Sequence, residues 1–443
     1  MAYGQYSQTP EAVWFNSVPA GWRATKIREL FSERNEKVSD KDFMPLSVGK
    51  MGVVPQLETA VKTDNGDNRK LIRKGDFAIN SRSDRKGSSG ISEYDGSSSL
   101  IITVLKPHNA INGQFYHYLL RSHFFVEEFY RNGHGLVSDL WTTKWEEMRN
   151  IYIPVPPREE QDQIVRYLDW QTSRINKLIH GYQREITLLE EQKATITNNA
   201  VVHGIDPSVD RAETKAAWMG LVPLMWNQMR MKNFFREINE RSVEGKEPHL
   251  SMSQKLGLVT DAENIGRPLL SESYAGAKLC EKDDLVLNRL KAHLGVFALA
   301  PIHGVVSPDY TVLRLDQNRI LPKYAEYLLK SNDCRRELRI RVRGIVEGFW
   351  RLYTDDLGAI PVCLPSIEEQ RDILEYIKEK IDPLDLAISK IAHEINLLRE
   401  YRTRLISDVV NGQIDVRGIE IPEYELEVDN SDMESGEDVE AEE

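Results

Sequence analysis

The sequence of 443 residues is short of cysteine and has no long apolar run. Its three cysteines, Cys280, Cys334 and Cys363, are odd in number and show no CxxC spacing, which predicts free thiols in a reducing compartment. No apolar stretch approaches the ~20 residues that a membrane span needs, and the N-terminal residues lack the pattern of a secretion signal. The ten histidines are not placed at zinc-ligand spacing with cysteine. We therefore expect a cytoplasmic protein without a membrane span or a metal site.

Familiar catalytic motifs are also missing from the sequence. It has no Walker-type GxxxxGK[ST], no GxSxG, no HExxH and no glycine-rich dinucleotide turn. The stretch 153–157 lacks the polar and aromatic partners of an amino-methyltransferase motif, and Pro308-Asp309 lacks the downstream acid-x-lysine of a common nuclease site. We predict a chain that is not catalytic by itself. An unfamiliar active site in one part of the chain stays open as an alternative.

The formal net charge of −12 argues against a nucleic-acid partner until its distribution is considered. Residues 422–443 contain eleven acidic residues and no Lys or Arg, so the rest of the chain is left near −1. A near-neutral body can carry basic faces, and binding to nucleic acid depends on where the charges lie. The acidic segment is polar and like-charged, which predicts disorder.

The C-terminal half of the sequence repeats the N-terminal half. Residues 115–200 align with residues 324–409 without a gap, at an offset of 209. Further upstream the offset slides to 208 and then to 204. Equivalent pairs include Trp141 and Trp350, Gln161 and Gln370, Asn80 and Asn288, and Trp22 and Trp226. A chain with two related but unequal modules is expected to do one kind of task at two places.

Each module is followed by a helical pattern about four times the length of an average helix, from about 158 to 202 and from about 366 to 410. The second helix opens on a capping box formed by Ser366 and Glu369. Both patterns stop at a glycine, Gly204 or Gly412, as a left-handed cap requires. Pro383 lies inside the second pattern, so we expect a kink or a brief break there.

The apolar residues of both helices alternate in steps of four and three, which is the spacing of a coiled coil. The predicted interface consists of Ile175, Ile179, Tyr182, Ile186, Leu189 and Ile196 in the first helix and Leu384, Ile388, Ile391, Ile395, Leu398 and Leu405 in the second. If the helices pair with each other they must be antiparallel, forming a rigid spacer of roughly 65 Å with a module at each end. The alternative is two independent amphipathic helices, each covering its own module.

Short β-like runs and helical stretches alternate in each module, so the fold class is predicted to be mixed α/β (α+β) with approximate two-fold symmetry. The predicted organisation is a first module at 1–157, a central spacer helix at 158–206, a second module at 207–365, a distal spacer helix at 366–416, and a disordered acidic tail at 417–443.

Polar and cationic loops between the expected strands are candidate DNA contacts, because Arg and Lys suit phosphates and guanine edges while Asn and Ser suit adenine edges or phosphates. The candidates are Asn80, Ser81, Arg82, Arg85 and Lys86 in the first module, and Asn288, Arg289, Lys291 and His293 in the second. A second stretch adds Arg339, Arg341 and Arg343. The loops are equally well read as plain surface loops, and the arginines as a solvated or acid-paired face.

The doubled module ending resembles that of the specificity subunits of type I DNA restriction-modification systems, over nearly the whole chain. Near the start of the first module stands Val18-Pro19-x-Gly21-Trp22, and residues 153–161, Ile-Pro-Val-Pro-Pro-Arg-Glu-Glu-Gln, lead into the long helix. The second copy departs modestly, with Leu224-Met225-Trp226 and Cys363-Leu364-Pro365 at the matching places. Two copies, each followed by a heptad helix, make the resemblance specific.

The resemblance implies that each module is a target-recognition domain for one half of a split, asymmetric sequence in double-stranded DNA. The helices would set the gap between the halves and dock two methyltransferase subunits that use S-adenosylmethionine. Motor-nuclease subunits that use ATP and Mg²⁺ would join the complex, while this chain itself would hold no cofactor. The competing interpretation is a coiled-coil scaffold for protein partners, without sequence-selective DNA binding.

Overall fold

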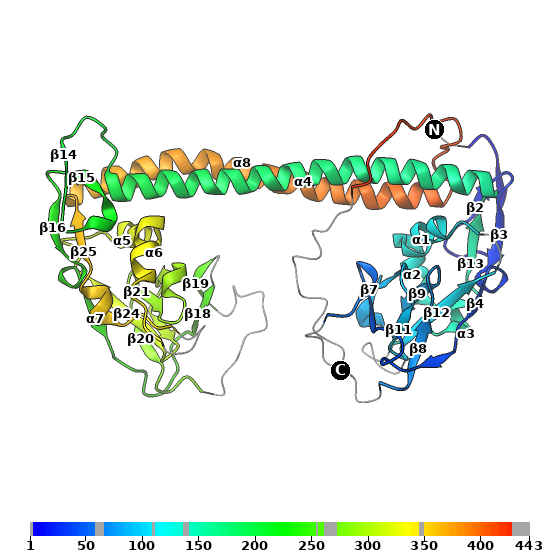
Figure 1. The fold of residues 1–443 in the computed structure, drawn as a ribbon, viewed down its shortest axis with the longest axis horizontal. Helices are drawn as coiled ribbons and strands as arrows, with labels where there is room; N and C mark the ends of the chain where they lie inside the picture. Colours follow the sequence, from blue (N-terminus) through cyan, green and yellow to red (C-terminus); the bar gives the residue numbers. More distant parts are fainter. Residues whose placement is uncertain are drawn as a thin grey trace. The chain divides into compact units, whose positions relative to one another are not determined.

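The computed structural model describes residues 3–57, 66–108, 111–135, 141–253, 256–260, 273–344 and 350–427, without the side chains of Ser83 and His293. Its contacts divide the chain into two units. Unit 1 contains Met1–Arg184 and Ala392–Glu443, and unit 2 contains Glu185–Ile391. Each unit therefore combines one copy of the sequence repeat with one end of each long helix (Figure 1).

The main sheet of unit 1 is antiparallel and has the order β10-β9-β12-β4. Its strands are β10 (Ser89–Ile91), β9 (Phe77–Asn80), β12 (Ile102–Pro107) and β4 (Phe31–Glu33). The smaller sheets are β11 (Gly96–Ser98) with β8 (Arg69–Ile72) and β5 (Lys37–Val38), β6 (Leu46–Gly49) with β7 (Gly52–Pro55), β13 (Tyr152–Val155) with β3 (Arg23–Lys26), and β1 (Tyr6–Gln8) with β2 (Ser17–Pro19). The short helices are η1 (Ile27–Glu29), η2 (Ser83–Arg85), α1 (Gly113–Arg121), α2 (His123–Arg131) and α3 (Trp145–Met148).

Unit 2 repeats this arrangement strand for strand in its main sheet, whose order is β17-β24-β21-β22. These strands are β17 (Phe235–Ile238), β24 (Tyr310–Leu315), β21 (Leu285–Asn288) and β22 (Phe297–Leu299). The smaller sheets are β20 (Lys278–Cys280) with β23 (Gly304–Val306), β18 (Leu250–Ser253) with β19 (Gly257–Thr260), β16 (Asn227–Arg230) with β25 (Pro361–Leu364), and β14 (Arg211–Glu213) with β15 (Leu221–Pro223). The short helices are η4 (Ala217–Met219), η5 (Met231–Asn233), η6 (Ala292–Leu294), α5 (Pro322–Lys330), α6 (Asn332–Arg339) and α7 (Thr354–Gly358). The sequence repeat is thus a structural repeat, and the mixed α/β class is confirmed.

The two long helices are present where the sequence predicts them. α4 (Arg158–His203) has 46 residues and α8 (Ile367–Val410) has 44. Gly204 and Gly412, which follow them, have φ of +75° and +72°, the left-handed conformation expected of a glycine cap. At the start of α8 the backbone N–H of Glu369 donates to Ser366 Oγ at 3.2 Å, as one half of a capping box does. α8 continues through Pro383, so of the kink or brief break that we expected there, the break is absent.

In each unit the beginning of one long helix contacts the end of the other. In unit 1 the guanidinium of Arg402 donates to Asn176 Oδ1 at 2.6 Å, and in unit 2 Lys193 pairs with Asp385. All the predicted interface residues, Ile175, Ile179, Tyr182, Ile186, Leu189, Ile196, Leu384, Ile388, Ile391, Ile395, Leu398 and Leu405, are buried or half-buried. The periodicity therefore selects the less exposed side of each helix.

A buried glutamine joins each long helix to its module. In unit 1 Gln161 accepts a hydrogen bond from the backbone N–H of Asn112 at 3.3 Å and donates to the carbonyl of Pro156 at 2.9 Å. In unit 2 Gln370 accepts from Leu321 N–H at 2.8 Å and donates to the Pro365 carbonyl at 3.1 Å. Each glutamine thus bonds at once to a backbone carbonyl just after the last strand of the module, β13 or β25, and to a backbone N–H at the start of a short helix, α1 or α5. This explains why the Glu-Glu-Gln signature is repeated.

The segment after α8 differs from the disordered tail that we expected to begin at 417. Gln163 of α4 donates to the carbonyl of Ile419 at 2.8 Å, and Asn176 donates to that of Glu427 at 2.7 Å. The carboxylate of Glu427 lies 2.8 Å from His180 Nδ1. Side chains of α4 therefore hold this segment along the helix as far as Glu427. The rest of the expected tail, 428–443, lies outside the described residues.

The described part of the chain has no helix that is long and apolar enough to cross a membrane. Cys280, Cys334 and Cys363 are buried and form no disulfide. Burial raises the pKa of the Cys280 thiol to about 12, so this sulfur stays protonated at neutral pH. Buried thiols of this kind act as small apolar residues rather than as nucleophiles.

We predict that Gln370→Ala lowers the free energy of unfolding by about 3 kcal/mol, because it leaves buried backbone groups of Leu321, Arg319 and Pro365 without a partner. The matched control is Gln192→Ala at an exposed position of α4, where we expect a change within about 0.5 kcal/mol. Urea unfolding followed by circular dichroism measures both. Equal effects would show that the buried glutamine does not join the helix to the module.

Candidate nucleic-acid interface

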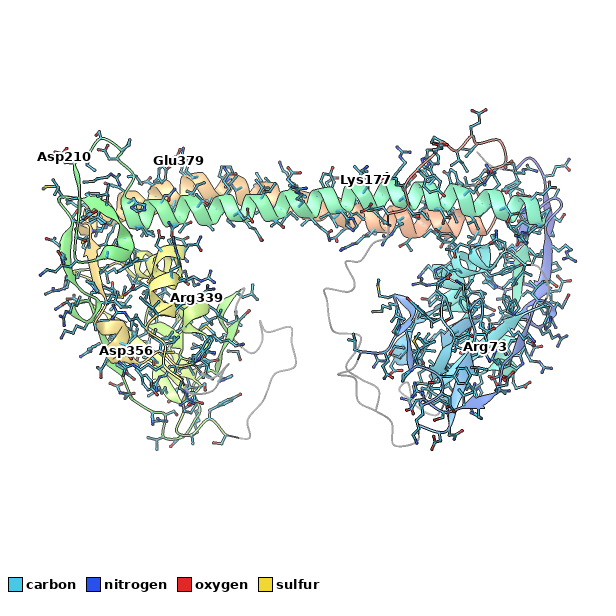
Figure 2. The ribbon with its side chains drawn as sticks, in the orientation of Figure 1. Arg73, Lys177, Asp210, Arg339, Asp356 and Glu379 are labelled. Atoms are coloured by element: carbon cyan, nitrogen blue, oxygen red, sulfur yellow. The ribbon has the colours of Figure 1, made fainter. Side chains whose placement is uncertain are left out.

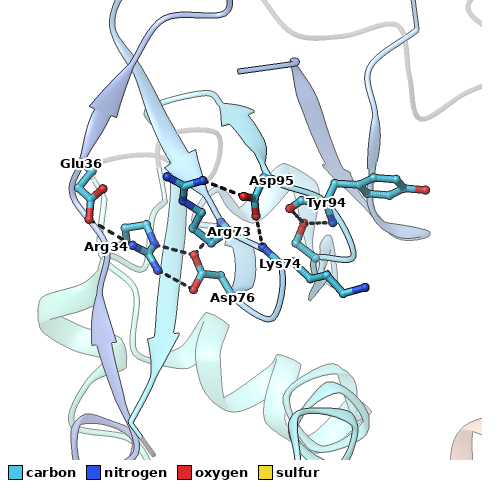
Figure 3. Close-up of polar contacts among 8 residues, drawn as sticks. Arg34, Glu36, Arg73, Lys74, Asp76, Tyr94 and Asp95 are labelled. Carbon is cyan, nitrogen blue, oxygen red and sulfur yellow. Dashed lines mark hydrogen bonds and ion pairs between the residues drawn. The ribbon is translucent and has the colours of Figure 1, made fainter. Parts of the chain in front are cut away.

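The two predicted loops start from strands whose first residues are held by a buried carboxylate. In unit 1 Asp76, just before β9, accepts two hydrogen bonds from Arg34, at 2.6 and 3.1 Å, and one from the backbone N–H of Arg73 at 2.9 Å (Figure 3). The neighbouring turn is held by Asp95, which accepts from Arg73 Nη1 at 2.7 Å. The hydrogen bond from Arg34 to Asp76 also raises the pKa of this guanidinium. Such a bidentate pair fixes both position and orientation.

Unit 2 reaches the same result with an arginine from another strand. Asp284, just before β21, accepts from Arg314 at 2.9 and 2.8 Å, and from Glu281 N–H at 2.8 Å. Arg314 belongs to β24, whereas Arg34 follows β4. Both units therefore have an aspartate just before the equivalent strand, but the arginine that pairs with it comes from a different place in each unit.

At the other end of each strand an asparagine closes the loop onto its own backbone. Asn80 Oδ1 accepts from Arg82 N–H at 3.0 Å, and Asn288 Oδ1 accepts from Leu290 N–H at 3.1 Å. Ser81, which is also buried, donates its hydroxyl to the carbonyl of Ile101 at 2.7 Å. The structure therefore gives Asn80, Asn288 and Ser81, which we predicted as DNA contacts, a role in shaping the loops.

A second backbone contact holds each loop from the opposite side. Thr143 N–H donates to the carbonyl of Ser81 at 2.9 Å, and Leu352 N–H donates to that of Arg289 at 3.1 Å. Thr143 and Leu352 are equivalent in the sequence repeat. The two loops are thus fixed by the same backbone bonds although their side chains differ, which is the arrangement of a rigid scaffold that carries variable residues.

The cations of the first loop divide by their partners. Lys86 pairs with Glu127 at 2.6 Å and its Nζ lies 4.8 Å from the centre of the Tyr130 ring, whereas Arg85 lies 3.9 Å from Asp84. Arg82 is exposed and has no acidic partner among the described residues. A pocket of about 20 Å³, room for a single water molecule, lies between this loop, α2 and Trp141.

The second loop carries one structural cation and one available cation. Arg289 donates to Thr311 Oγ1 at 2.7 Å and pairs with Glu237 at 3.3 Å, beside the buried Lys278. Lys291 is exposed, and no ion pair engages it within the described part of the chain. The side chain of His293 lies outside the described residues.

The arginine-rich stretch is largely paired with acids. Arg341 pairs with Glu337 at 2.6 Å, and Arg343 pairs with Asp356. Arg339, in the last turn of α6, is exposed, and no carboxylate among the described residues pairs with it (Figure 2). The stretch is therefore no continuous cationic face, because these carboxylates neutralise most of its guanidinium groups.

Sequence reasoning treated the second loop and the arginine stretch as separate candidates, and the structure brings them together. η6, within the loop, packs against α6, where Gly295 lies beside the side chain of Arg335. The sequence also did not predict that Glu127, Tyr130 and Trp141 surround the first loop in unit 1. Only the alignment of Trp141 with Trp350 signalled that these positions matter.

Equivalent positions beside the two loops carry different chemistry. His117 of α1 accepts from Ile91 N–H at 3.3 Å and lies 2.9 Å from Arg121, and burial lowers the pKa of this imidazole to about 3. The equivalent residue, Glu326, pairs with Lys330 at 2.8 Å. Burial alone would raise the pKa of Glu326, but the neighbouring lysines hold it below its ordinary value. The side chain at this position is thus neutral in unit 1 and ionised in unit 2.

Comparison with known proteins shows what the chain is similar to. Residues 19–188 match the family model described as the type I restriction modification DNA specificity domain. A putative type I restriction enzyme MjaX specificity subunit from Methanocaldococcus jannaschii is 21% identical over 397 residues, and the match covers 87% of each chain. The first module of the chain is therefore similar to the type I restriction modification DNA specificity domain, and most of the chain is similar to a specificity subunit.

The chain is also similar to solved structures. A structure described as "Structural basis underlying complex assembly and conformational transition of the type I R-M system" is 17% identical with a TM-score of 0.60, covering 90% of this chain and 99% of that chain. This likeness shows a shared fold. The HsdS subunit from Thermoanaerobacter tengcongensis is 18% identical with a TM-score of 0.42, over 90% of this chain and 98% of that chain.

We predict that Arg289→Ala destabilises the protein by about 1–3 kcal/mol, because Glu237 and Thr311 lose a charged hydrogen-bond partner. Lys291→Ala, two residues away, is expected to stay within about 0.5 kcal/mol. Thermal unfolding of both variants separates the structural cation from the available one. Indistinguishable melting curves would remove this distinction.

Proposed function

We propose that this protein is the sequence-reading, non-catalytic specificity subunit of a type I methyltransferase complex, and that each recognition domain contacts one half of a split DNA sequence. The observation that carries the proposal is the repeated loop. Both units hold it by the same backbone bonds, while Arg82 and Lys86 in one and Lys291 in the other differ in type and position. One frame with two sets of side chains suits two different half-sites.

In this proposal Arg82, Lys86 and Lys291 contact DNA, and Arg85, Arg343 and His293 stay weaker candidates. The exposed ion pair of Lys86 with Glu127 costs little to exchange for a phosphate, because pairs in water contribute only about 0–1 kcal/mol. Arg289 and Arg341 are less suited, since both are bonded within the protein. Phosphate contacts would supply most of the affinity and make it strongly dependent on salt.

The recognition domains of the proposal are residues 1–157 and 207–365, and the spacer segments are 158–206 and 366–416. The less exposed sides of α4 and α8 support an antiparallel coiled coil as the spacer. Leu188 and Leu397, equivalent in the repeat, are 56% and 44% exposed. Two equivalent apolar positions suit two copies of a methyltransferase subunit that uses S-adenosylmethionine. ATP- and Mg²⁺-dependent motor-nuclease subunits would join this complex.

The test is selection of bound duplexes from a random DNA library by the full chain in complex with its methyltransferase subunit. We expect a motif of two short half-sites separated by a fixed gap, and a loss of affinity of about 10³-fold between 50 and 200 mM salt. Bound duplexes without any common sequence would favour the scaffold interpretation. Methyl transfer by this chain alone would contradict a non-catalytic subunit.

The spacer can be tested by inserting one heptad into both helices, between Arg184 and Glu185 and between Ile391 and Ala392, at the boundaries of the two units in the chain. Seven residues lengthen a helix by about 10 Å, which corresponds to about three base pairs. We expect the selected gap to grow by that amount with both half-sites unchanged. A changed half-site, or an unchanged gap, would show that the helices do not set the spacing.

A further inference from the structure

The arginines of α6 and the residues after it are not equivalent to one another. Arg336 pairs with Asp333, Arg341 with Glu337 and Arg343 with Asp356. Arg335 lies against Gly295 of the neighbouring loop. Each of these side chains therefore has a structural role or a carboxylate beside it.

Arg339 is different, because it is exposed in the last turn of α6 without an acidic partner in the part of the chain that the structure describes. Its neighbour in the sequence, Ile340, is 74% exposed, so an exposed apolar side chain stands next to Arg339 in the chain. Arg339 is also held in place by a short helix whose buried residues, Cys334 and Leu338, belong to the core of unit 2.

This position suits a base edge better than a phosphate. The carbonyl groups at the end of α6 carry partial negative charge, which disfavours an approaching phosphate. A guanine edge carries no net charge, and its O6 and N7 atoms match the two parallel donors of a guanidinium. The exposed Lys291 on the adjoining loop, with its single point charge, is the better phosphate contact.

The equivalent position in unit 1 is Tyr130, at the repeat offset of 209. Its ring lies under Lys86, at 4.8 Å from the Nζ atom to the ring centre. The same place on the frame therefore offers a guanidinium fork in unit 2 and an aromatic ring with an ammonium group in unit 1. Two such groups cannot make the same hydrogen bonds to a base.

We propose that Arg339 is a specificity-determining residue, which reads a guanine in the half-site bound by unit 2. This assignment rests on the proposed function, because it presupposes that unit 2 contacts one half of a split sequence. It goes further by naming the residue, the base and the half-site.

The experiment repeats the library selection with the full chain in its methyltransferase complex, carrying Arg339→Ala or Arg339→Lys. We expect Arg339→Ala to abolish the preference for guanine at one position of one half-site, with a 10- to 100-fold loss of affinity for the original sequence. Arg339→Lys should restore binding only in part, because an ammonium cannot form the paired contact. The other half-site should be unchanged.

Two control variants separate base reading from other roles. Arg336→Ala removes an arginine of the same helix that is also exposed but is paired with an acid, and it should leave the selected motif unchanged. Lys291→Ala should weaken binding to all sequences alike and lower the salt dependence by about one phosphate contact. Melting curves and assembly with the methyltransferase check that each variant is folded.

The outcomes distinguish this inference from the proposed function. A wild-type complex that selects no split motif would overturn both. Two outcomes would overturn only the assignment of Arg339. In the first, the Arg339→Ala complex selects the same split motif; in the second, its affinity falls by the same factor for all sequences. The assignment is supported if the Arg339→Ala complex loses the preference for guanine at a single position while the Arg336→Ala complex selects the original motif.

Discussion

The hydrogen bonds of one buried glutamine in each unit are the constraint on which the rest depends. Gln161 and Gln370 join three elements at once, namely the strand that ends a module, the short helix that follows its main sheet, and the first turn of a long helix. A long helix can set the position of a recognition surface only if the module is fixed to it. These two side chains contribute to that fixation through hydrogen bonds to backbone groups, beside the apolar core that the long helices share with the module in unit 2.

The two units share the contacts that hold their loops, but they differ in the side chains that the loops expose. The carboxylates of Asp76 and Asp284 and the amides of Asn80 and Asn288 hold both loops in the same way. The arginine that binds each carboxylate comes from a different strand, so the repeat keeps the geometry while the sequence around it changes. The loop side chains are under no such constraint. This division allows one folded frame to carry two different sets of DNA contacts.

Local sequence patterns were sufficient to predict the long helices, their glycine caps and their less exposed sides, because helix periodicity and capping depend on residues a few positions apart. Of the kink or brief break expected at Pro383, the break is absent, since α8 continues through this residue. The partners of the cations could not be predicted. Arg343 meets Asp356, and Arg289 meets Glu237 fifty-two residues upstream, through contacts that only the tertiary fold creates. The contacts of Glu427 with α4 belong to the same class, because they join residues far apart in the chain.

The central claim is that one chain directs a methyltransferase to a split, asymmetric sequence by means of two unequal recognition surfaces. Mapping of methylated adenines across the DNA of a host that expresses this chain with its methyltransferase tests this claim most directly. The account predicts that the methylated adenines share one motif of two different half-sites at a fixed gap. Methylation at one continuous motif, or at two identical half-sites, would contradict it.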